Sequence, residues 1–286
     1  MNETGRVIIH DLHSHTSASD GVLSPDALVQ RAVDMRVNVL AITDHDTVAG
    51  IAPARQAIAD ANLPLQLVSG VEISTLWENI EIHVVGLNIE ETHPQITHLL
   101  RAQSERRQQR AVLIAERLDK AKIPGALEGA MRHAQGGEIT RGHFARFLVE
   151  EKRANSIADV FKKYLAKGKT GYVAPQWCTI QQAIDVIHQA GGQAVLAHPA
   201  RYGLSAKWLK RLLAYFSECG GDAMEVAQCQ QAPNERTLLA SYARQFNLLA
   251  SQGSDFHQPC AWIELGRKLW LPAGVEPVWL RWANCP

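Results

Sequence analysis

Short apolar runs rich in β-forming residues alternate with helical segments along the first ninety residues of the chain. The runs cover residues 7–9, 37–42, 65–71 and 82–87. Between the first two runs, residues 25–35 predict a helix, with Ser24 as its N-cap and Pro25 at its first position. Strands and helices that alternate at this spacing predict parallel βα units.

The alternation stops near residue 95. Residues 95–175 contain no strand-like run and predict a helical insertion, which opens with a long charged helix over residues 95–122. Strand and helix patterns then return, at residues 193–197, 222–226 and 248–251 for strands and 181–189 and 205–216 for helices. We therefore expect an α/β domain built from residues 1–94 and 176–286, interrupted by a helical domain of residues 95–175. The pattern alone fits an open sheet as well as a barrel.

The composition is typical of a globular protein without an excess of either charge. Of 286 residues, 46% are hydrophobic and 20% are charged, and 29 basic residues balance 29 acidic ones. Zero net charge argues against a surface that is cationic throughout. The sequence shows no membrane helix, no signal peptide and no C-x-x-C pair among its five cysteines. We therefore expect a reduced cytoplasmic protein that has no disulfides and no contact with a membrane.

Clusters of histidine and carboxylate residues accompany six of the apolar runs. These clusters are His10-Asp11-Leu12-His13-Ser14-His15, Thr43-Asp44-His45-Asp46, Gly70-Val71-Glu72, His83, His198-Pro199 and Ser254-Asp255-Phe256-His257. Asp20 follows the first cluster. His13 and His15 are two residues apart, so in an extended strand they point to the same side. Because the carboxyl ends of parallel strands form the active face of α/β folds, we expect these side chains to converge.

A metal centre accounts for this set better than separate structural roles do. Taken alone, a buried histidine is usually a hydrogen-bonded core residue, Asp20 before Gly21 fits a turn, and Asp44 or Asp46 fits a helix cap. Together, imidazole and carboxylate groups suit Zn²⁺, Mn²⁺ and Fe²⁺. The set is too large for one tetrahedral ion. Two or three ions are therefore expected, in an arrangement suited to phosphoryl transfer.

The same residues resemble the motifs of the PHP (polymerase and histidinol phosphatase) family, over residues 8–258. The resemblance implies a distorted (β/α)7 barrel with three divalent ions, most often Mn²⁺, with Zn²⁺ or Fe²⁺ as alternatives. It also implies that a hydroxide bridging the metals is the nucleophile. The metal ligands that it implies are His13, His15, Asp20, His45, Glu72, His83, His198, Asp255 and His257. Glu72 would bridge two ions, and Asp11 and Asp44 would either orient ligand histidines or serve as turn and cap residues.

Part of the helical insertion resembles one branch of this family. The resemblance rests on Arg141-Gly142-His143-Phe144-Ala145 and on residues 160–165 and 168–173. The branch includes 3′,5′-nucleoside bisphosphate phosphatases and 5′→3′ exoribonucleases. It implies a hydrolase that releases 5′ mononucleotides from short or single-stranded 5′-phosphorylated RNA and also removes the 5′ phosphate of 3′,5′-nucleoside bisphosphates. These substrates are the expected partners, and no obligatory protein partner is indicated.

A substrate phosphate that is not attacked needs cations around it, because a guanidinium fork matches phosphate oxygens. The candidates are Arg141, Lys169 and Arg201, with His143 as a further contact. Arg201 has the strongest positional argument, since it lies three residues after His198. Each cation has the alternative of a solvated surface position.

Three other features also allow two interpretations. Arg106, Arg110 and Arg117 share one face of the long helix and either contact an RNA backbone or are solvated. Glu225 at the end of a strand either lines the pocket or is a buried, paired acid. The tryptophans near the C-terminus either stack on bases or pack in the fold, and they are Trp262, Trp270, Trp279 and Trp282.

Three other functions are the alternatives. The first is a phosphatase acting only on small molecules, of the nucleoside bisphosphate or histidinol phosphate type. The helical insertion argues against the histidinol phosphate type, because so small a phosphomonoester does not need one. An amidohydrolase also begins with an H-x-H motif, but it commonly has a metal-bridging lysine, and no lysine stands at these strand ends. A non-catalytic PHP module typically lacks metal ligands, whereas all nine implied ligands are present here.

Overall fold

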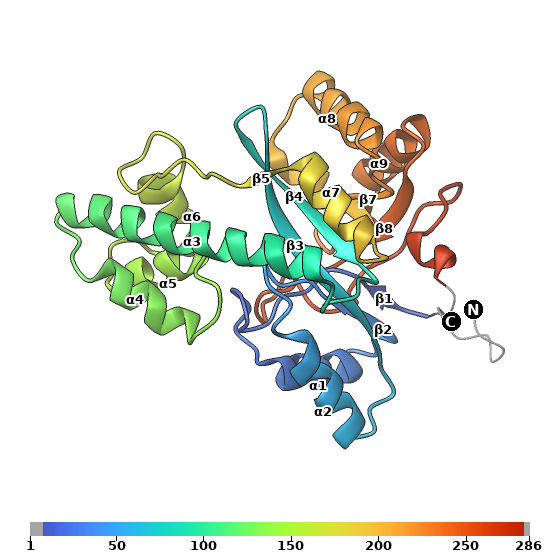
Figure 1. Ribbon diagram of the computed structural model, residues 1–286, viewed down its shortest axis with the longest axis horizontal. Coiled ribbons are helices and arrows are strands. Elements are labelled where there is room, and N and C mark those ends of the chain that lie inside the picture. The colour runs from blue at the N-terminus through green and yellow to red at the C-terminus, as the bar shows by residue number, and fades with distance from the viewer. Residues whose placement is uncertain (1–7, 283–286) are drawn as a thin grey trace.

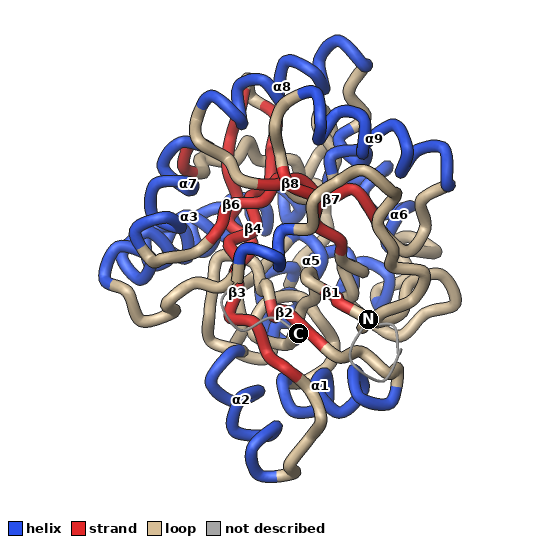
Figure 2. The backbone as a smooth tube through the Cα atoms, turned by 90° about the vertical axis from the view of Figure 1, so that its right-hand side faces the viewer, coloured by secondary structure: helices blue, strands red, loops and turns tan. Residues whose placement is uncertain are grey.

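A computed structural model describes residues 8–282 of the chain. Its central sheet has helices packed around it (Figure 2). The strands are β1 (His10–Asp11), β2 (Val39–Ile42), β3 (Gln66–Trp77), β4 (Ile80–Leu87), β5 (Cys178–Thr179), β6 (Gln193–Leu196), β7 (Ala223–Ala227) and β8 (Leu249–Gln252). They lie in the order β1-β2-β3-β4-β6-β7-β8, and β5 pairs with β3 outside this path.

The two ends of the sheet meet, so that the sheet is a nearly closed barrel. The backbone N–H of Leu12 donates to the carbonyl of Gln252 at 3.1 Å, and that of His15 donates to the carbonyl of Phe256 at 2.9 Å. An isolated parallel bridge joins Ser14 to Phe256. The expected α/β barrel is confirmed. The seam brings the segments after β1 and β8, which carry the first and last histidine clusters, side by side.

One strand of the barrel runs against the others. β4 is antiparallel to both β3 and β6, whereas the sequence predicted parallel βα units. The reason is the turn between β3 and β4, where Glu78 and Asn79 have φ angles of 49° and 61°. Two consecutive residues with positive φ form a tight hairpin turn, which leaves no room for a crossover helix. Glu72 therefore lies within β3 rather than at a strand end.

The first strand also lies later than predicted. Residue 7 of the predicted run 7–9 is outside the described residues, and the paired strand is His10–Asp11. Asn38 and Val39 still donate to the carbonyl of Ile9, so the ladder begins one residue before the assigned strand. The remaining predicted strands coincide with observed ones, although β3 extends six residues beyond the predicted end at residue 71 because of the hairpin.

Helices pack on the outside of the barrel on two sides (Figure 1). They are α1 (Pro25–Asp34), α2 (Ile51–Asp60), α7 (Ile180–Gln189), α8 (Ala206–Glu218) and α9 (Pro233–Gln245), with short 3-10 turns η2 (Pro199–Tyr202) and η3 (Val278–Arg281). Buried residues such as Leu12 and Val195 form a small apolar cluster among the strands. Ile184, Leu212 and Phe216 belong to the larger core beneath α7, α8 and α9.

The remaining helices project from one side of the barrel (Figure 1). They are α3 (Pro94–Lys120), α4 (Ala126–Ala134), α5 (Arg141–Glu150), α6 (Ile157–Val160) and the π-helical turn η1 (Phe161–Leu165). They bury a core of their own, to which Leu118, Phe144 and Val160 belong. The domain boundaries at residues 95 and 175 remain a prediction. Among the described residues, no helix has both the length and the apolar character needed to span a membrane.

Candidate metal centre

The nine implied ligands lie together at one end of the barrel, although they come from six separate segments. They fall into overlapping groups whose ligand atoms are all within 4.8 Å of one another. The groups are His15, Asp20, His45 and His257; His13, His15, Glu72 and Asp255; and His45, Glu72 and His83. His198 adjoins the third group, since its Nε2 lies 3.0 Å from Glu72 Oε1. Each group shares at least one side chain with another.

Glu72 is central to the arrangement. Its Oε2 lies 3.3 Å from Nε2 of both His13 and His15 and 3.1 Å from Nδ1 of His45. Its other oxygen, Oε1, lies 2.8 Å from Nδ1 of His83. The side chain is 1% exposed. Burial opposes ionisation, but the surrounding histidines hold the pKa of Glu72 well below its usual value. A carboxylate with its two oxygens facing different histidine sets is suited to bridging two ions.

Asp20 organises the outer group. Its Oδ1 lies 3.2 Å from Nε2 of His257, and its Oδ2 lies 3.9 Å from Nε2 of His45. Against the effect of burial, His257 and His45 hold the pKa of Asp20 well below the ordinary value. The pKa of His257 rises to about 9, because Asp20 and Asp255 outweigh its burial. Anionic carboxylates and nearby imidazoles are the donors that a divalent cation needs.

Four buried ligand atoms lack a hydrogen-bond partner among the described residues. They are Asp20 Oδ1, His45 Nδ1, Glu72 Oε2 and His198 Nδ1. His45 Nδ1 and Glu72 Oε2 are 3.1 Å apart, but they are not aligned for a hydrogen bond. Unpaired buried polar atoms are uncommon in folded proteins and call for a specific cause. Divalent cations among these atoms would satisfy the three that lie within the close groups, so the donor set fits the implied metals.

The backbone around the centre is locally strained. Asp46, His198 and Asp255 have φ angles of 50°, 30° and 54°, in a region that residues other than glycine seldom adopt. Such conformations persist where surrounding contacts fix them, and they concentrate at functional sites. The loops that follow β2, β6 and β8 therefore each make a sharp bend at the metal centre.

Glu225 on β7 positions one of the ligands. Its Oε1 lies 2.6 Å from Nδ1 of His13, and its Oε2 accepts from the backbone N–H of His198 at 2.6 Å. With the Nδ1 proton of His13 directed at Glu225, Nε2 faces the other ligands. Of the two interpretations of Glu225, a pocket-lining residue or a buried, paired acid, these contacts support the second. The sequence offered Asp11 and Asp44 for this kind of support, with a turn or cap role as the alternative.

Asp11 and Asp44 hold backbone and hydroxyl groups, and neither carboxylate is hydrogen-bonded to a ligand ring among the described residues. Asp11 accepts from the N–H groups of Ser254 and Gly266, each at 2.8 Å. Burial raises its pKa to about 6. Asp44 accepts from the N–H of Thr16 at 2.7 Å and from the Ser19 hydroxyl at 2.6 Å. Both carboxylates therefore fix the loops that carry ligands, as turn residues do.

A cavity of about 390 Å³ opens beside the metal centre and extends to the projecting helices. Of the metal ligands, Asp20, His45, His83, Asp255 and His257 line it. Four arginines also line it, namely Arg107, Arg110, Arg141 and Arg146. A partly apolar wall completes the lining, made by Ile157, Phe161, Cys260 and Ile263. The cavity thus combines candidate metal ligands, cations and an apolar surface.

Glu81 anchors two of these arginines. Its Oε2 accepts from Nη2 of Arg141 at 2.8 Å, and its Oε1 lies 3.5 Å from Nη1 of Arg110 and accepts from Trp177 at 2.8 Å. Although burial opposes ionisation, the two arginines lower the pKa of Glu81 to about 2. Nη2 of Arg110 is buried without a partner among the described residues. The cluster has more cations than anions and can accept an anionic ligand.

The predicted phosphate-binding residues are not all at the cavity. Arg141 lines it, whereas Arg201 is paired with Asp255 and is not among the lining residues. His143 is buried, and its Nδ1 accepts from the backbone N–H of Thr140 at 3.1 Å. Lys169 is exposed and does not line the cavity. The structure therefore brings one of the four candidates to the cavity.

Sequence reasoning did not single out Arg146, Thr140, Glu81 or Arg107 as parts of a site. Nη2 of Arg146 donates to the carbonyl of Asp20, and the Thr140 hydroxyl donates to Oδ2 of Asp20 at 2.8 Å. Arg107 is held by Asp46, with its Nε 2.7 Å from Oδ2. These contacts span from 61 to 126 residues of sequence. Only the capping pattern at Thr140 gave a local signal.

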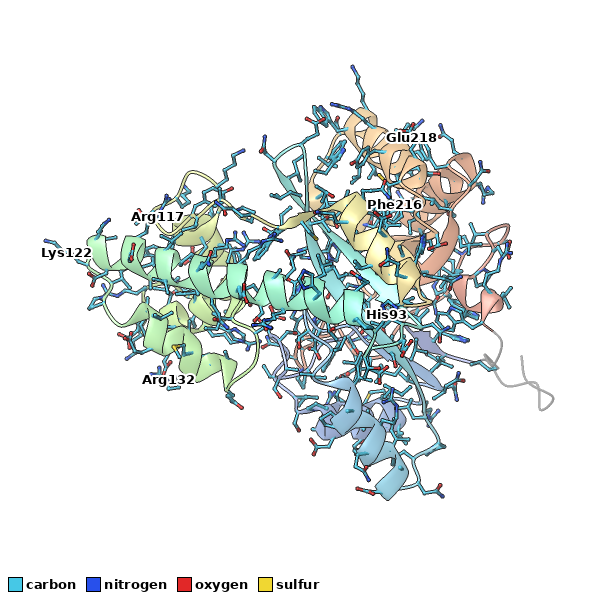
Figure 3. All side chains as sticks on the ribbon, viewed as in Figure 1. His93, Arg117, Lys122, Arg132, Phe216 and Glu218 are labelled. Carbon is cyan, nitrogen blue, oxygen red and sulfur yellow. The ribbon has the colours of Figure 1, made fainter. Side chains whose placement is uncertain are left out.

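The side chains of Arg106, Arg110 and Arg117 on the long helix have different surroundings. Arg110 is buried at the cavity, and Arg106 donates to Gln103 at 2.6 Å. Arg117 donates to the carbonyl of Tyr172 and lies toward the end of α3 that is remote from the barrel (Figure 3). The three side chains therefore have separate local partners, and the contact of Arg106 and Arg117 with an RNA backbone stays a prediction.

Comparison with known proteins agrees with this geometry. A model of the PHP domain matches residues 11–173. The chain is 73% identical to a protein of Escherichia coli (strain K12) named 5′-3′ exoribonuclease Rnm, over 99% of this chain and 96% of the relative. It is 38% identical to a 3′,5′-nucleoside bisphosphate phosphatase of Chromobacterium violaceum, over 94% of each.

A solved structure from Chromobacterium violaceum is also similar. It is described as an amidohydrolase with bound sulfate and no metal, and it matches with a TM-score of 0.89 at 38% identity. The match covers 94% of each chain, so the likeness includes the projecting helices as well as the barrel.

Proposed function

Because this chain belongs to the PHP family, we propose that it is a phosphoester hydrolase that removes 5′ mononucleotides, one at a time, from short or single-stranded RNA, and that it also hydrolyses 3′,5′-nucleoside bisphosphates. One observation carries the proposal: a metal-ligand set and four arginines face the same cavity. A nucleotide with two phosphates needs both features. The four cysteines among residues 8–282 are free, which suits a reducing cytoplasm.

We assign three divalent ions, Mn²⁺ by preference, to the three overlapping groups. His15, Asp20, His45 and His257 would hold one ion; His13, His15, Glu72 and Asp255 a second; and Glu72, His83 and His198 the third, with His45 shared. When bound, the ions would lower the pKa of a water molecule and stabilise charge on the phosphoryl oxygens.

The arginines of the cavity would bind the phosphate that is not attacked. Among the lining residues outside the ligand set, Glu81 is the one acid that faces Arg141 and Arg110. Burial lowers the pKa of Arg110 to about 10. The positive charges of Arg141 and Arg107 contribute to this lowering, whereas the negative charge of Glu81 opposes it. An anion would relieve this repulsion, and bidentate guanidinium–phosphate bonds fix its orientation. Arg201, held at Asp255, remains a second candidate.

The reaction on RNA sets the register of the substrate. Release of a 5′ mononucleotide breaks the bond between phosphorus and the 3′ oxygen of the first nucleotide, so the phosphate between nucleotides one and two must lie at the metals. The terminal 5′ phosphate then lies among the arginines. In the same register a bisphosphate would place its 3′ phosphate at the metals. Loss of its 5′ phosphate needs the small substrate to bind in the reverse direction.

The other functions are weaker candidates. No lysine is among the described residues that line the cavity, and a metal-bridging lysine is what an amidohydrolase of this type commonly has. A phosphatase restricted to small molecules is favoured by the relative from Chromobacterium violaceum, since that protein is named for a bisphosphate substrate. The two substrates therefore have to be compared directly.

A manganese-supplemented assay tests the proposal. The substrates are a short 5′-phosphorylated oligoribonucleotide and adenosine 3′,5′-bisphosphate, with products identified by chromatography. We expect stepwise release of 5′ mononucleotides and turnover of the bisphosphate. Asp20→Ala and His257→Ala should abolish both activities together, whereas Asp26→Ala, at an exposed position on α1, should leave both unchanged.

Two results would contradict the proposal. Turnover of the bisphosphate alone would limit the enzyme to small molecules. Loss of one activity without the other in Asp20→Ala or His257→Ala would show that the two reactions do not share a site. The nucleotide left after hydrolysis of the bisphosphate, adenosine 5′-monophosphate or adenosine 3′-monophosphate, shows which phosphate was attacked and so fixes the register.

A further inference from the structure

We propose that Trp262 is a stacking platform for the base of the second nucleotide of the RNA substrate, the nucleotide just beyond the bond that breaks. The inference rests on the proposed function and assigns a further binding site to it. The residue lies in a turn that starts three residues after the candidate ligand His257 and whose ends, Cys260 and Ile263, line the cavity.

The turn that carries Trp262 is part of the cavity wall. Cys260 and Ile263 both line the cavity, and the residues between them, Ala261 and Trp262, are exposed. The backbone N–H of Ile263 lies 3.3 Å from Sγ of Cys260, which closes the turn. Arg267 also donates from Nη1 to the carbonyl of Ala261 at 2.7 Å. The tryptophan is therefore presented to solvent at the cavity edge by a turn with its own fixed contacts.

Trp262 differs from every other tryptophan of the chain. Among the large hydrophobic residues that the structure describes, its side chain is the most exposed, at 74%, and no ring contact or hydrogen bond of its indole is found there. The other six each have a partner: Trp77 packs on Trp208, Trp177 donates to Glu81, Trp270 lies against Arg236, Trp279 stacks on His10, and Trp282 donates to Gln193. Packing therefore accounts for those six and leaves Trp262 unexplained.

The path of the substrate explains an exposed indole at this place. The first nucleotide occupies the cavity, and the scissile phosphate lies at the metals. The rest of the chain must leave across the rim, and the segment that follows His257 forms part of that rim. Stacking of a base on an aromatic ring is worth about 1–3 kcal/mol and accepts any base. This suits an exonuclease, which meets every base in turn at the same position.

A pair of substrates separates this role from the chemistry of the metal centre. Adenosine 3′,5′-bisphosphate has no second base, whereas 5′-phosphorylated diadenylate has one. Trp262→Ala should lower kcat/KM for the dinucleotide about tenfold. It should lower the ratio of dinucleotide to bisphosphate kcat/KM by the same factor. Trp262→Phe, which keeps an aromatic ring, should restore most of the loss. Trp208→Ala, a half-exposed tryptophan on α8, is the control and should leave the ratio unchanged.

A dinucleotide that lacks its second base gives an independent test. The wild-type enzyme should cleave it as slowly as Trp262→Ala cleaves the complete dinucleotide, and Trp262→Ala should cause no further loss on it. The role in stacking would be overturned if the wild-type enzyme cleaved both substrates and Trp262→Ala left the ratio of their kcat/KM values unchanged. An equal loss of activity on both substrates would be such a result. If the wild-type enzyme hydrolysed neither substrate, the proposed function itself would fail, and this inference with it.

Discussion

The hydroxyl of Thr140 donates a hydrogen bond of 2.8 Å to Oδ2 of Asp20, across 120 residues of sequence. Thr140 is also the N-cap of α5, where its Oγ1 accepts from the N–H of Gly142 at 3.0 Å. Nearby, the N–H of Glu138 donates to the carbonyl of Ala18 at 2.8 Å. One side chain thus begins a projecting helix and positions a candidate metal ligand, which joins the two parts of the cavity.

Replacement of Thr140 should therefore affect stability and activity together. Thr140→Val keeps the shape but removes the hydroxyl. We expect it to lower the free energy of unfolding by about 0.5–2 kcal/mol, because an N-cap is lost. The manganese concentration needed for half-maximal activity should rise as well. Thr140→Ser keeps the hydroxyl and should behave as the wild type. Urea denaturation and metal titration would measure both effects, and an unchanged Thr140→Val protein would show that the contact has no such role.

Glu225→Gln should weaken metal binding without unfolding the barrel. The carboxylate receives the Nδ1–H of His13 at 2.6 Å, and a neutral amide holds an imidazole less strongly. Supporting residues of this kind typically contribute 10–100-fold to metal affinity or activity. Activity against manganese concentration should therefore shift by roughly 10–100-fold. Glu218→Gln, at an exposed position on α8, is the matched control. Equal curves for the two variants would exclude the positioning role.

Arg141→Ala should raise KM for substrates that carry a second phosphate. A hydrogen bond to a charged group is worth about 1.5–3 kcal/mol, so we expect an increase of roughly 10–100-fold with a smaller change in kcat. The penalty should disappear on adenosine 3′-monophosphate, which lacks the 5′ phosphate. Lys169→Ala should change neither parameter, since Lys169 is exposed and away from the cavity lining. A larger effect from Lys169 than from Arg141 would reverse the assignment.

His143 should make the protein less stable in acid. Burial lowers its pKa from 6.5 to about 4 in the folded state. Below pH 6.5 the unfolded chain therefore binds a proton that the folded chain still excludes, and stability is lost as the pH falls from 6.5 towards 4. Through this residue, the free energy of unfolding should fall by about 2 kcal/mol between about pH 7 and pH 5.

His143→Gln provides the comparison. Glutamine at this helix position can still accept from the N-cap N–H, so the capping box is kept while the titrating group is removed. The free energy of unfolding of the wild type, measured by urea denaturation, should fall more steeply with acid than that of His143→Gln. Parallel curves would show that His143 is not the group responsible.

The sequence predicted most of the barrel because its signals are local. Apolar runs and the clusters that follow them depend on neighbouring residues, and the metal motifs depend on short spacings. The strand β4 was predicted but its reversed direction was not, because the turn at Glu78 and Asn79 lacks the glycine that usually marks a tight hairpin. The helices α2 and α9 are not among those whose bounds the sequence predicted, although Pro233 in the first turn of α9 is a start signal.

The cavity could not be predicted to the same extent. The partners of Glu81 are Arg110, Arg141 and Trp177, which lie 29, 60 and 96 residues away. Nothing in the sequence around Glu81 indicates that these side chains meet, since their contact depends on how the projecting helices pack against the β3–β4 hairpin. For the same reason Lys169 was named among the candidate phosphate ligands, whereas Arg146 was not.

The shared side chains of the metal centre affect how the ions are taken up. His15, His45 and Glu72 each belong to two of the three candidate ligand groups, so that each group shares side chains with the other two. An ion bound as proposed to one group would fix the orientation of a side chain in the next group and so lower the entropy cost of binding the next ion. If the ions bind as proposed, their uptake should therefore be cooperative, and partial chelation should leave a mixture of full and empty molecules rather than a uniform population with one ion missing.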